Sequence, residues 1–283
     1  MITAGIDVGA GSAKAVILEG HEVLAQASVR TGPNLGAAAS ECYRAALSSS
    51  GLRSEDVGYV AATGFGRYQV LGRDIQITEV TCHARGSMLL FPRTRCVLDI
   101  GAQSSRAIRV DGDGRVLRFK MNDRCAAGAG RFVERIARAL EVSVAEFSAA
   151  SLRAQDPVSI SSICAVLAES EVINHITQGR TVEDIAMGAH LSIADRVLAL
   201  LRQVGVEDEV TLTGGMSQNA GMVRALEQRL GRRINVSDAS PFAGALGAAV
   251  LGARRLEKLG RGGPPRVTSE LLPEALAAVR GAA

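Results

Sequence analysis

Residues 5–17 read GIDVGAGSAKAVI, and residues 97–109 read VLDIGAQSSRAIR. In each copy a β-rich run is followed by a short glycine turn and a second β-rich run, and a further strand-like arm follows at 20–30 or 113–121. Each copy is therefore predicted to form a three-stranded antiparallel meander. The repeat aligns Asp7 with Asp99, Gly9 with Gly101, and Lys14 with Arg106.

Helical patterns fill the chain between these strands. Asn34 is placed to cap a helix through about Ser50, and Thr181 with Asp184 resembles a capping box that opens a helix to about Gln203. Residues 129–141 carry apolar side chains at four-residue steps. A late strand at 210–215 and two further helices complete an alternation of strands and helices, which is typical of the α/β class.

Composition narrows the partners and the compartment. The chain has 283 residues with 47% apolar and 22% charged residues, which is typical of a globular protein with a sizeable core. Only 3% of the residues are aromatic, and 32 Lys+Arg against 29 Asp+Glu give a net charge of +3, so no nucleic-acid partner is expected. No long uncharged apolar stretch, no signal-peptide pattern and an odd number of cysteines favour a cytoplasmic protein without a membrane span.

The two D-x-G turns have the residue types of a phosphate site. Gly9 and Gly11 let backbone N–H groups approach phosphate oxygens, Ser12 adds a donor, and Lys14 adds a positive charge. The aspartates at the ends of the two strands, Asp7 and Asp99, are candidates to hold a hydrated Mg²⁺. The plainer alternative is that Asp-Gly only forms a hairpin turn; the presence of two copies favours the phosphate site.

A third element, VTLTGGMSQNAG at 210–221, runs from a strand into Gly214 and Gly215 and then into a helix. Backbone at a glycine pair can lie against a ribose or a nucleobase because no Cβ intervenes. The chain contains no G-x-x-x-x-G-K-[ST] loop, which excludes a P-loop ATPase, and no dinucleotide-binding fingerprint in a βαβ context.

Two of the five cysteines precede predicted helices. Cys125 lies just before the helix at 129–141, and Cys164 lies near the start of another. A helix N-terminus stabilises a thiolate or an anionic iron–sulfur cluster. Two cysteines cannot complete a four-cysteine site, but two chains around a two-fold axis can, which predicts a dimer with one cluster. Cys42, Cys96 and the pair Cys82-His83 are interpreted as structural.

These motifs resemble those of a known family. The repeated D-x-G hairpins and the late TGG resemble the acetate and sugar kinase, Hsp70 and actin superfamily. NDRCAAGAGRFVE (122–134) and SSICAVLAESEVIN (161–174) resemble the cysteine motifs of the CoA-ester activases, which are activators of 2-hydroxyacyl-CoA dehydratases and ATPase subunits of benzoyl-CoA reductases. The resemblance runs from residue 2 to about residue 256. It implies two ribonuclease H-like halves with a nucleotide cleft between them: 1–92 plus about 242–260, then 93–241, with a tail at 261–283.

The resemblance also implies a role for each candidate residue. One [4Fe–4S] cluster would be shared between two subunits, with Cys125 and Cys164 ligating half of it, and MgATP would be the nucleotide. Asp7 and Asp99 would hold the Mg²⁺ or position the attacking water, and Glu169 is a further candidate to orient that water. The nucleotide-binding residues would be Gly9, Gly11, Ser12 and Lys14 in the first phosphate motif, Gly101 and Gln103 in the second, and Gly214 and Gly215 at the adenosine.

The second phosphate motif departs from the family pattern. DIGAQSS stands where D-I-G-G-Q-D is frequent, so Ala102 replaces a glycine and Ser104 replaces an acidic residue. With the SSICAVLAESEVIN motif, the chain resembles the smaller, δ-type ATPase subunit of benzoyl-CoA reductase. That resemblance implies a subunit that passes electrons from reduced ferredoxin or flavodoxin, at the expense of ATP, to a partner that reduces an aromatic acyl-CoA.

Three other functions remain open from the sequence. The chain is alternatively a homodimeric activator of a 2-hydroxyacyl-CoA dehydratase. A metabolite kinase of the same fold would use Asp99 or another carboxylate as a base and would need no iron. A non-enzymatic ATP-binding regulator would also lack a cluster. The sequence does not decide between a homodimer and a hetero-oligomer.

Overall fold

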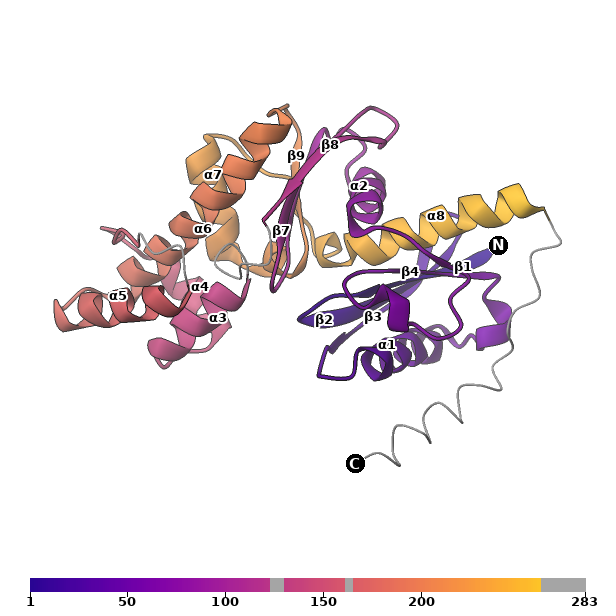
Figure 1. The fold of residues 1–283 in the computed structure, drawn as a ribbon, viewed down its shortest axis with the longest axis horizontal. Helices are drawn as coiled ribbons and strands as arrows, with labels where there is room; N and C mark the ends of the chain where they lie inside the picture. Colours follow the sequence, from indigo (N-terminus) through magenta and orange to yellow (C-terminus); the bar gives the residue numbers. More distant parts are fainter. Residues whose placement is uncertain (123–129, 161–164, 261–283) are drawn as a thin grey trace. The chain divides into compact units, whose positions relative to one another are not determined.

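The computed structural model describes residues 1–122, 130–160 and 165–260 (Figure 1). The chain divides into two compact units: unit 1, Met1–Leu89 with Phe242–Ala283, and unit 2, Leu90–Pro241. Each unit is built on one mixed sheet that opens with a three-stranded antiparallel meander, so the meander predicted for each repeat is confirmed. In the described part of the chain no helix is long and apolar enough to span a membrane.

The sheet of unit 1 has the strand order β3-β2-β1-β4-β5. β1 pairs with β2 antiparallel and with β4 parallel, so the meander continues on its other side through a parallel strand. The elements are β1 (Ile2–Val8), β2 (Ser12–Glu19), β3 (Glu22–Arg30), α1 (Leu35–Ser50), η1 (Ser54–Asp56), β4 (Tyr59–Thr63), η2 (Arg67–Gln69), β5 (Ile75–Gln76), α2 (Glu79–Leu90) and α8 (Ala243–Leu259).

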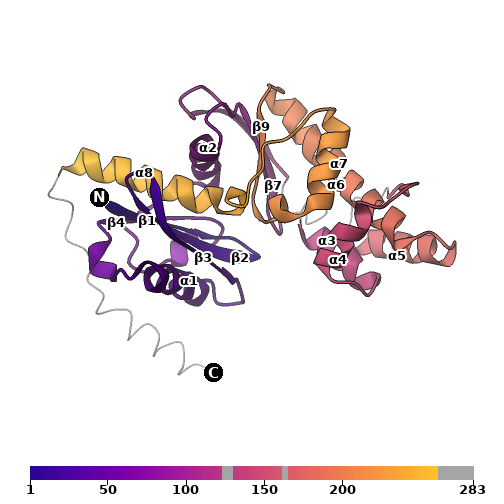
Figure 2. The ribbon, with the colours of Figure 1, turned by 180° about the vertical axis from the view of Figure 1, so that it is seen from behind.

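Helices cover both faces of this sheet, as Figures 1 and 2 show from opposite sides. Alternate residues of β1 point to opposite faces. Ala4, Ile6 and Val8 pack in the core under α1, whose N-terminus is capped by Asn34 as predicted. The other residues, Asp7 among them, lie on the face that α8 covers.

Two helices of unit 1 cross at small residues. A Cβ on Gly86 of α2 would overlap the carbonyl oxygen of Ala243 at the start of α8. A Cβ on Gly247 of α8 would likewise overlap the carbonyl oxygen of Cys82 in α2. The backbones of α2 and α8 are therefore in direct contact, which fixes the position of the His83 turn of α2 against α8.

The sheet of unit 2 repeats the first with the order β8-β7-β6-β9, in which β6 pairs with β7 antiparallel and with β9 parallel. Where unit 1 has its fifth strand, β5, unit 2 has only a parallel bridge between Thr211 and Asn235 among its described residues. The strands are β6 (Cys96–Ile100), β7 (Ser105–Val110), β8 (Val116–Met121) and β9 (Val210–Thr213).

The described helices of unit 2 pack against one face of this sheet. Cys96, Leu98 and Ile100 of β6 belong to the core that these helices form, so Asp99 lies on the opposite face. Thr181 caps α6 through the backbone N–H of Asp184, as predicted. The helices are α3 (Gly130–Ala139), α4 (Val144–Ser151), α5 (Ala165–Thr177), α6 (Val182–Val204), η4 (Gly215–Gln218) and α7 (Ala220–Leu230), and η5 (Ser240–Phe242) leads out of the unit.

Candidate functional site

Both D-x-G segments form closed turns between two antiparallel strands. In the first loop (Asp7–Ser12), the N–H of Gly9 donates to the carbonyl of Ser12 at 3.1 Å; in the second loop (Asp99–Ser104), the N–H of Gly101 donates to the carbonyl of Ser104 at 2.9 Å. Gly11 and Gln103 lie within these two turns, as predicted from the repeat. The two loops therefore have the same backbone hydrogen bond at equivalent positions.

A Thr-Gly pair ends the neighbouring parallel strand in each unit. Thr63 is in register with Asp7, and Thr213 is in register with Asp99. The glycine that follows has a positive φ in both cases, 91° at Gly64 and 82° at Gly214. A Cβ at either position would lie 2.5 Å from Oδ1 of the aspartate of its unit, so each carboxylate packs directly on a glycine. Gly214 was predicted as a site residue; Gly64 was not, although the same Thr-Gly ending follows β4.

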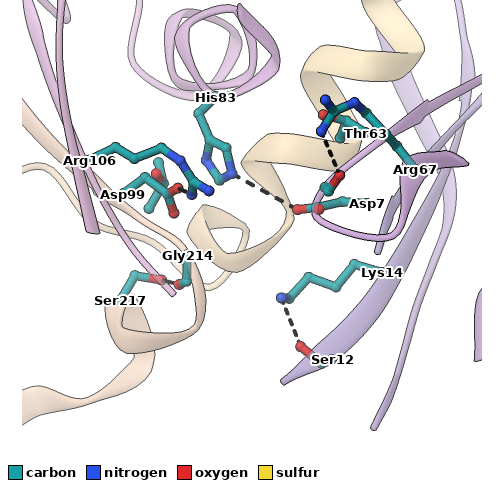
Figure 3. A network of polar contacts seen from close by, with 12 residues as sticks. Asp7, Ser12, Lys14, Thr63, Arg67, His83, Asp99, Arg106, Gly214 and Ser217 are labelled. Atoms are coloured by element: carbon teal, nitrogen blue, oxygen red, sulfur yellow. Dashed lines mark hydrogen bonds and ion pairs between the residues drawn. The ribbon is translucent and has the colours of Figure 1, made fainter. Parts of the chain in front are cut away.

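The carboxylate of Asp7 lies at the α2–α8 crossing of unit 1. The side chain is only 7% exposed, and its Oδ2 is 3.9 Å from Nε2 of His83 in α2 (Figure 3). A Cβ on Gly244 of α8 would overlap Oδ2 of Asp7 and would lie 2.9 Å from the same His83 nitrogen. His83 was interpreted from the sequence as a structural neighbour of Cys82, whereas the structure places it beside Asp7.

Lys14 directs its ammonium group toward the first loop. It is the register partner of Asp7 on β2, is 8% exposed, and donates from Nζ to Oγ of Ser12 at 2.9 Å. Figure 3 shows the two side chains pointing toward each other. A cation and a hydroxyl donor thus lie together at the glycine turn, the combination that binds phosphate oxygens.

Arg106 occupies the same register position in unit 2 and behaves differently. It is the register partner of Asp99, and its Nη1 donates to Oδ2 of that aspartate at 2.6 Å. Asp99 is 2% exposed and Arg106 is 8% exposed, so this is a buried ion pair (Figure 3). The sequence aligned Arg106 with Lys14 but assigned it no role.

The Gly214–Gly215 turn is held from the interior of unit 2. Oγ of Ser217 donates to the carbonyl of Gly214 at 2.7 Å. Asn219 caps α7 by accepting from the N–H of Met222 at 2.9 Å, and its Oδ1 also accepts from Oγ of Ser148 at 3.0 Å. A Cβ on Gly215 would meet nothing within 4 Å, so the backbone there is open to a ligand.

The second loop also contacts the start of α3. The carbonyl of Gly101 accepts from the N–H of Gly130, and the carbonyl of Ala102 accepts from the N–H of Arg131, both at 2.9 Å. Two of the N–H groups that a helix leaves without an intrahelical partner are thereby satisfied. The loop and the first turn of α3 form one hydrogen-bonded unit.

The predicted cluster ligands Cys125 and Cys164 lie outside the described residues. The three described cysteines are buried, which confirms their structural interpretation. Burial raises the pKa of the Cys42 thiol to about 11 and that of the Cys82 thiol to about 12, and it raises the pKa of Cys96 as well. Within the described ranges, no three His, Cys, Asp or Glu side chains gather into a metal-binding group.

Glu169 lies on α5, where its carboxylate accepts from Nε of Arg135 in α3 at 2.7 Å. The side chain is 39% exposed, so the pair is a surface ion pair between two packed helices. Its role in orienting water stays a prediction.

Comparison with known proteins shows close relatives over nearly the whole chain. The 2-hydroxyisocaproyl-CoA dehydratase activator of Clostridioides difficile is 41% identical over 251 residues, which cover 88% of this chain and 94% of that protein. The D-type subunit of benzoyl-CoA reductase from Thauera aromatica is 42% identical over 277 residues, which cover 94% and 98% of the two chains.

The fold has a close counterpart among solved structures. The activator of the 2-hydroxyisocaproyl-CoA dehydratase from Clostridium difficile, with bound ADPNP, superposes with a TM-score of 0.87 at 39% identity, covering 93% of this chain and 99% of that one. The fold is thus that of the actin/Hsp70-like ATPases, as the sequence predicted. The model of the BadF/BadG/BcrA/BcrD ATPase family matches residues 4–252. With two D-x-G loops, their Thr-Gly partners and this match across both units, the chain belongs to the BadF/BadG/BcrA/BcrD ATPase family.

Proposed function

We propose that this chain is an ATP-hydrolysing, [4Fe–4S]-containing subunit that drives low-potential electrons from ferredoxin or flavodoxin into a partner that reduces an aromatic acyl-CoA. The observation that carries the proposal is the pair of D-x-G loops, each closed by one backbone hydrogen bond and each with its aspartate packed on a glycine. Phosphoryl transfer to water depends mainly on positioning and on electrostatic stabilisation of the phosphate, and rigid loops with N–H and cationic donors supply both.

The nucleotide residues keep the roles predicted from the sequence. Lys14 and Ser12 contact phosphate oxygens through the ammonium and hydroxyl groups that meet at the first loop. Asp7 and Asp99 order Mg²⁺ or the attacking water, with Glu169 as the weaker candidate for the water. The remaining contacts come from backbone groups at Gly9, Gly11, Gly101, Gln103, Gly214 and Gly215.

The cluster is assigned to Cys125 and Cys164, with a second ATPase subunit giving the other two thiolates. Two observations support this donor set. The other cysteines are buried with raised pKa values, so their thiolate forms are disfavoured. The helices that follow the two candidates, α3 and α5, pack against each other, and the N-terminal dipole of each favours an anionic group. When bound, the cluster supplies a one-electron carrier.

The aryl-CoA reductase role is favoured over the dehydratase activator by the SSICAVLAESEVIN motif and by the similarity to the D-type subunit of benzoyl-CoA reductase. The dehydratase activator of Clostridioides difficile is similar to nearly the same degree, so that role is the alternative. A metabolite kinase with Asp99 as base is disfavoured, because a carboxylate bound by a guanidinium is a weak base. The proposed setting is the cytoplasm.

The test is to purify the complex without oxygen from its own cells and to measure its native mass, subunit content and iron. A hetero-oligomer with a related ATPase chain and two reductase-type chains supports the reductase, whereas a brown homodimer supports the dehydratase activator. A colourless, iron-free protein contradicts both and leaves the kinase or the regulator. Cys125→Ala should remove the iron and leave MgATP binding largely intact; normal iron in that variant would refute the ligand assignment.

A further inference from the structure

We propose that the two duplicated aspartates have different tasks: Asp7 is the carboxylate that orders the divalent cation, whereas Asp99 is held by Arg106 and is not a metal ligand. Arg106 is then a positioning residue of the second loop. The inference rests on the proposed ATPase function and assigns the metal to one of the two carboxylates.

The case for Asp99 begins with its immediate surroundings. Its Oδ2 accepts from Arg106 Nη1 at 2.6 Å, and its Oδ1 packs on the backbone of Gly214. A charge-assisted bond of this length between two buried groups is strong, and removing either partner leaves an uncompensated charge. A cation approaching Asp99 would have to displace this guanidinium and would meet its positive charge.

The rest of the second loop offers the cation no other carboxylate. Ala102, Gln103 and Ser104 follow Gly101, and none of them is acidic. A divalent magnesium ion prefers carboxylate and water oxygens and keeps several of its waters, so one or two carboxylates usually hold it. In the second loop the only carboxylate is the one that Arg106 binds.

Asp7 differs in the cation that its strand pairing provides. Lys14, its register partner, donates to Ser12 rather than to the carboxylate. Within the described residues no arginine or lysine forms an ion pair with Asp7, and the basic group beside it is Nε2 of His83 at 3.9 Å. The two glycines against its oxygens, Gly64 and Gly244, leave the carboxylate fixed in place without neutralising it.

The experiment measures cation affinity and turnover separately. Mn²⁺ binding in the presence of ADP is followed by the electron paramagnetic resonance signal of free Mn²⁺, and kcat for ATP hydrolysis is measured at saturating Mg²⁺. We expect Asp7→Asn to weaken Mn²⁺ binding about tenfold or more and Asp99→Asn to change it by no more than about twofold. Asp99→Asn should nevertheless lower kcat about tenfold or more, because the second loop loses its fixed position.

Variants of Arg106 test the positioning role. Arg106→Lys keeps the charge but loses the guanidinium geometry, so we expect unchanged Mn²⁺ affinity with reduced kcat. Because Arg106→Gln leaves a buried carboxylate without its cation and can unfold the chain, the double variant Asp99→Asn/Arg106→Gln removes both charges together; it should bind Mn²⁺ like the unmodified protein. Asp184→Asn is the matched control, since Asp184 is a second buried aspartate of unit 2 that accepts from the backbone N–H groups of Gln155 and Asp156.

Two results would overturn the proposal: Asp99→Asn weakening Mn²⁺ binding as much as Asp7→Asn, or Asp7→Asn leaving it unchanged. Failure of the ATPase assignment itself looks different. In that case the unmodified protein neither hydrolyses ATP nor gains Mn²⁺ affinity when ADP is added, and the variants have nothing to compare.

Discussion

The first and second loops share one backbone and differ in where one cation points. In both, the aspartate ends the first strand, its neighbour across the antiparallel pair is basic, and a glycine with positive φ lies against Oδ1. In unit 1 the basic residue is Lys14, which reaches the loop; in unit 2 it is Arg106, which binds the carboxylate. A duplicated backbone can therefore carry two electrostatic states, set by the side chain at a single register position.

The largest effect is expected from removing the cation of unit 2. Arg106→Met should lower the free energy of unfolding by about 3–5 kcal/mol, because it leaves Asp99 charged and buried without its partner. Asp99→Asn/Arg106→Met should recover most of that loss. Urea unfolding of the four members of this double-mutant cycle measures the coupling, and a coupling energy near zero would show that the pair is not what holds the two residues.

The two glycines offer a substitution that should act alike in both units. Gly64→Ala and Gly214→Ala each place a Cβ 2.5 Å from an aspartate oxygen and force alanine to a positive φ. We expect each to cost about 2–4 kcal/mol of unfolding free energy, from backbone strain together with overpacking. Equal losses in urea unfolding would support the equivalence of the two backbones; a loss at only one position would contradict it.

A buried histidine makes the stability of unit 2 depend on pH. His190 is fully buried, and burial lowers its pKa to about 4 from the ordinary value of 6.5. The unfolded chain therefore takes up a proton between pH 6.5 and 4 that the folded chain refuses, so stability is complete above pH 6.5 and falls as the pH drops toward 4. The loss is at most about 3 kcal/mol.

His190→Leu separates this contribution from that of the carboxylates, which also weaken the fold in acid. Unfolding free energies from hydrogen exchange in unit 2, measured at about pH 7 and about pH 4.5, should fall less in His190→Leu than in the unmodified protein. Exchange in unit 1 serves as the internal control, because the substitution is remote from its core. Equal pH dependence in the two proteins would rule out the histidine as the cause.

The smallest stability effect is expected at the cation of unit 1. Lys14→Met removes one hydrogen bond, to Ser12, and leaves no ion pair broken among the described residues, so the cost should be about 1 kcal/mol. Its effect on ATP should be larger, because the ammonium is lost from the first loop: KM for ATP should rise with a smaller change in Mn²⁺ affinity. A stability loss as large as that of Arg106→Met would mean that the two loops are electrostatically alike after all.

Local features of the fold were predictable because local sequence determines them. The two meanders follow from strand-like runs separated by turn residues, and the helices of Asn34 and Thr181 begin where their caps allow. The aspartates and glycines of the two loops were found because they recur in a repeat. The roles of these residues in binding nucleotide remain predictions.

Contacts between distant segments were not predictable in the same way. Lys14 and Arg106 occupy equivalent positions, and only the rotamer of a long side chain decides whether it reaches the loop or the carboxylate. His83 follows Cys82 in sequence, but consecutive helical residues point in different directions, and its neighbour Asp7 comes from another element. Gly64 lacked a second glycine of the Gly214–Gly215 kind to draw attention to it.

The hydrogen bonds between the second loop and α3 restrict how that loop can respond to a ligand. The carbonyls of Gly101 and Ala102 complete the first turn of α3, with bonds worth about 1 kcal/mol each. A shift of the loop by an ångström or more must either break both bonds at once or carry the helix with it. Small displacements are thus converted into a choice between two discrete arrangements, and the helix that would report the choice is the one that follows Cys125 in the chain.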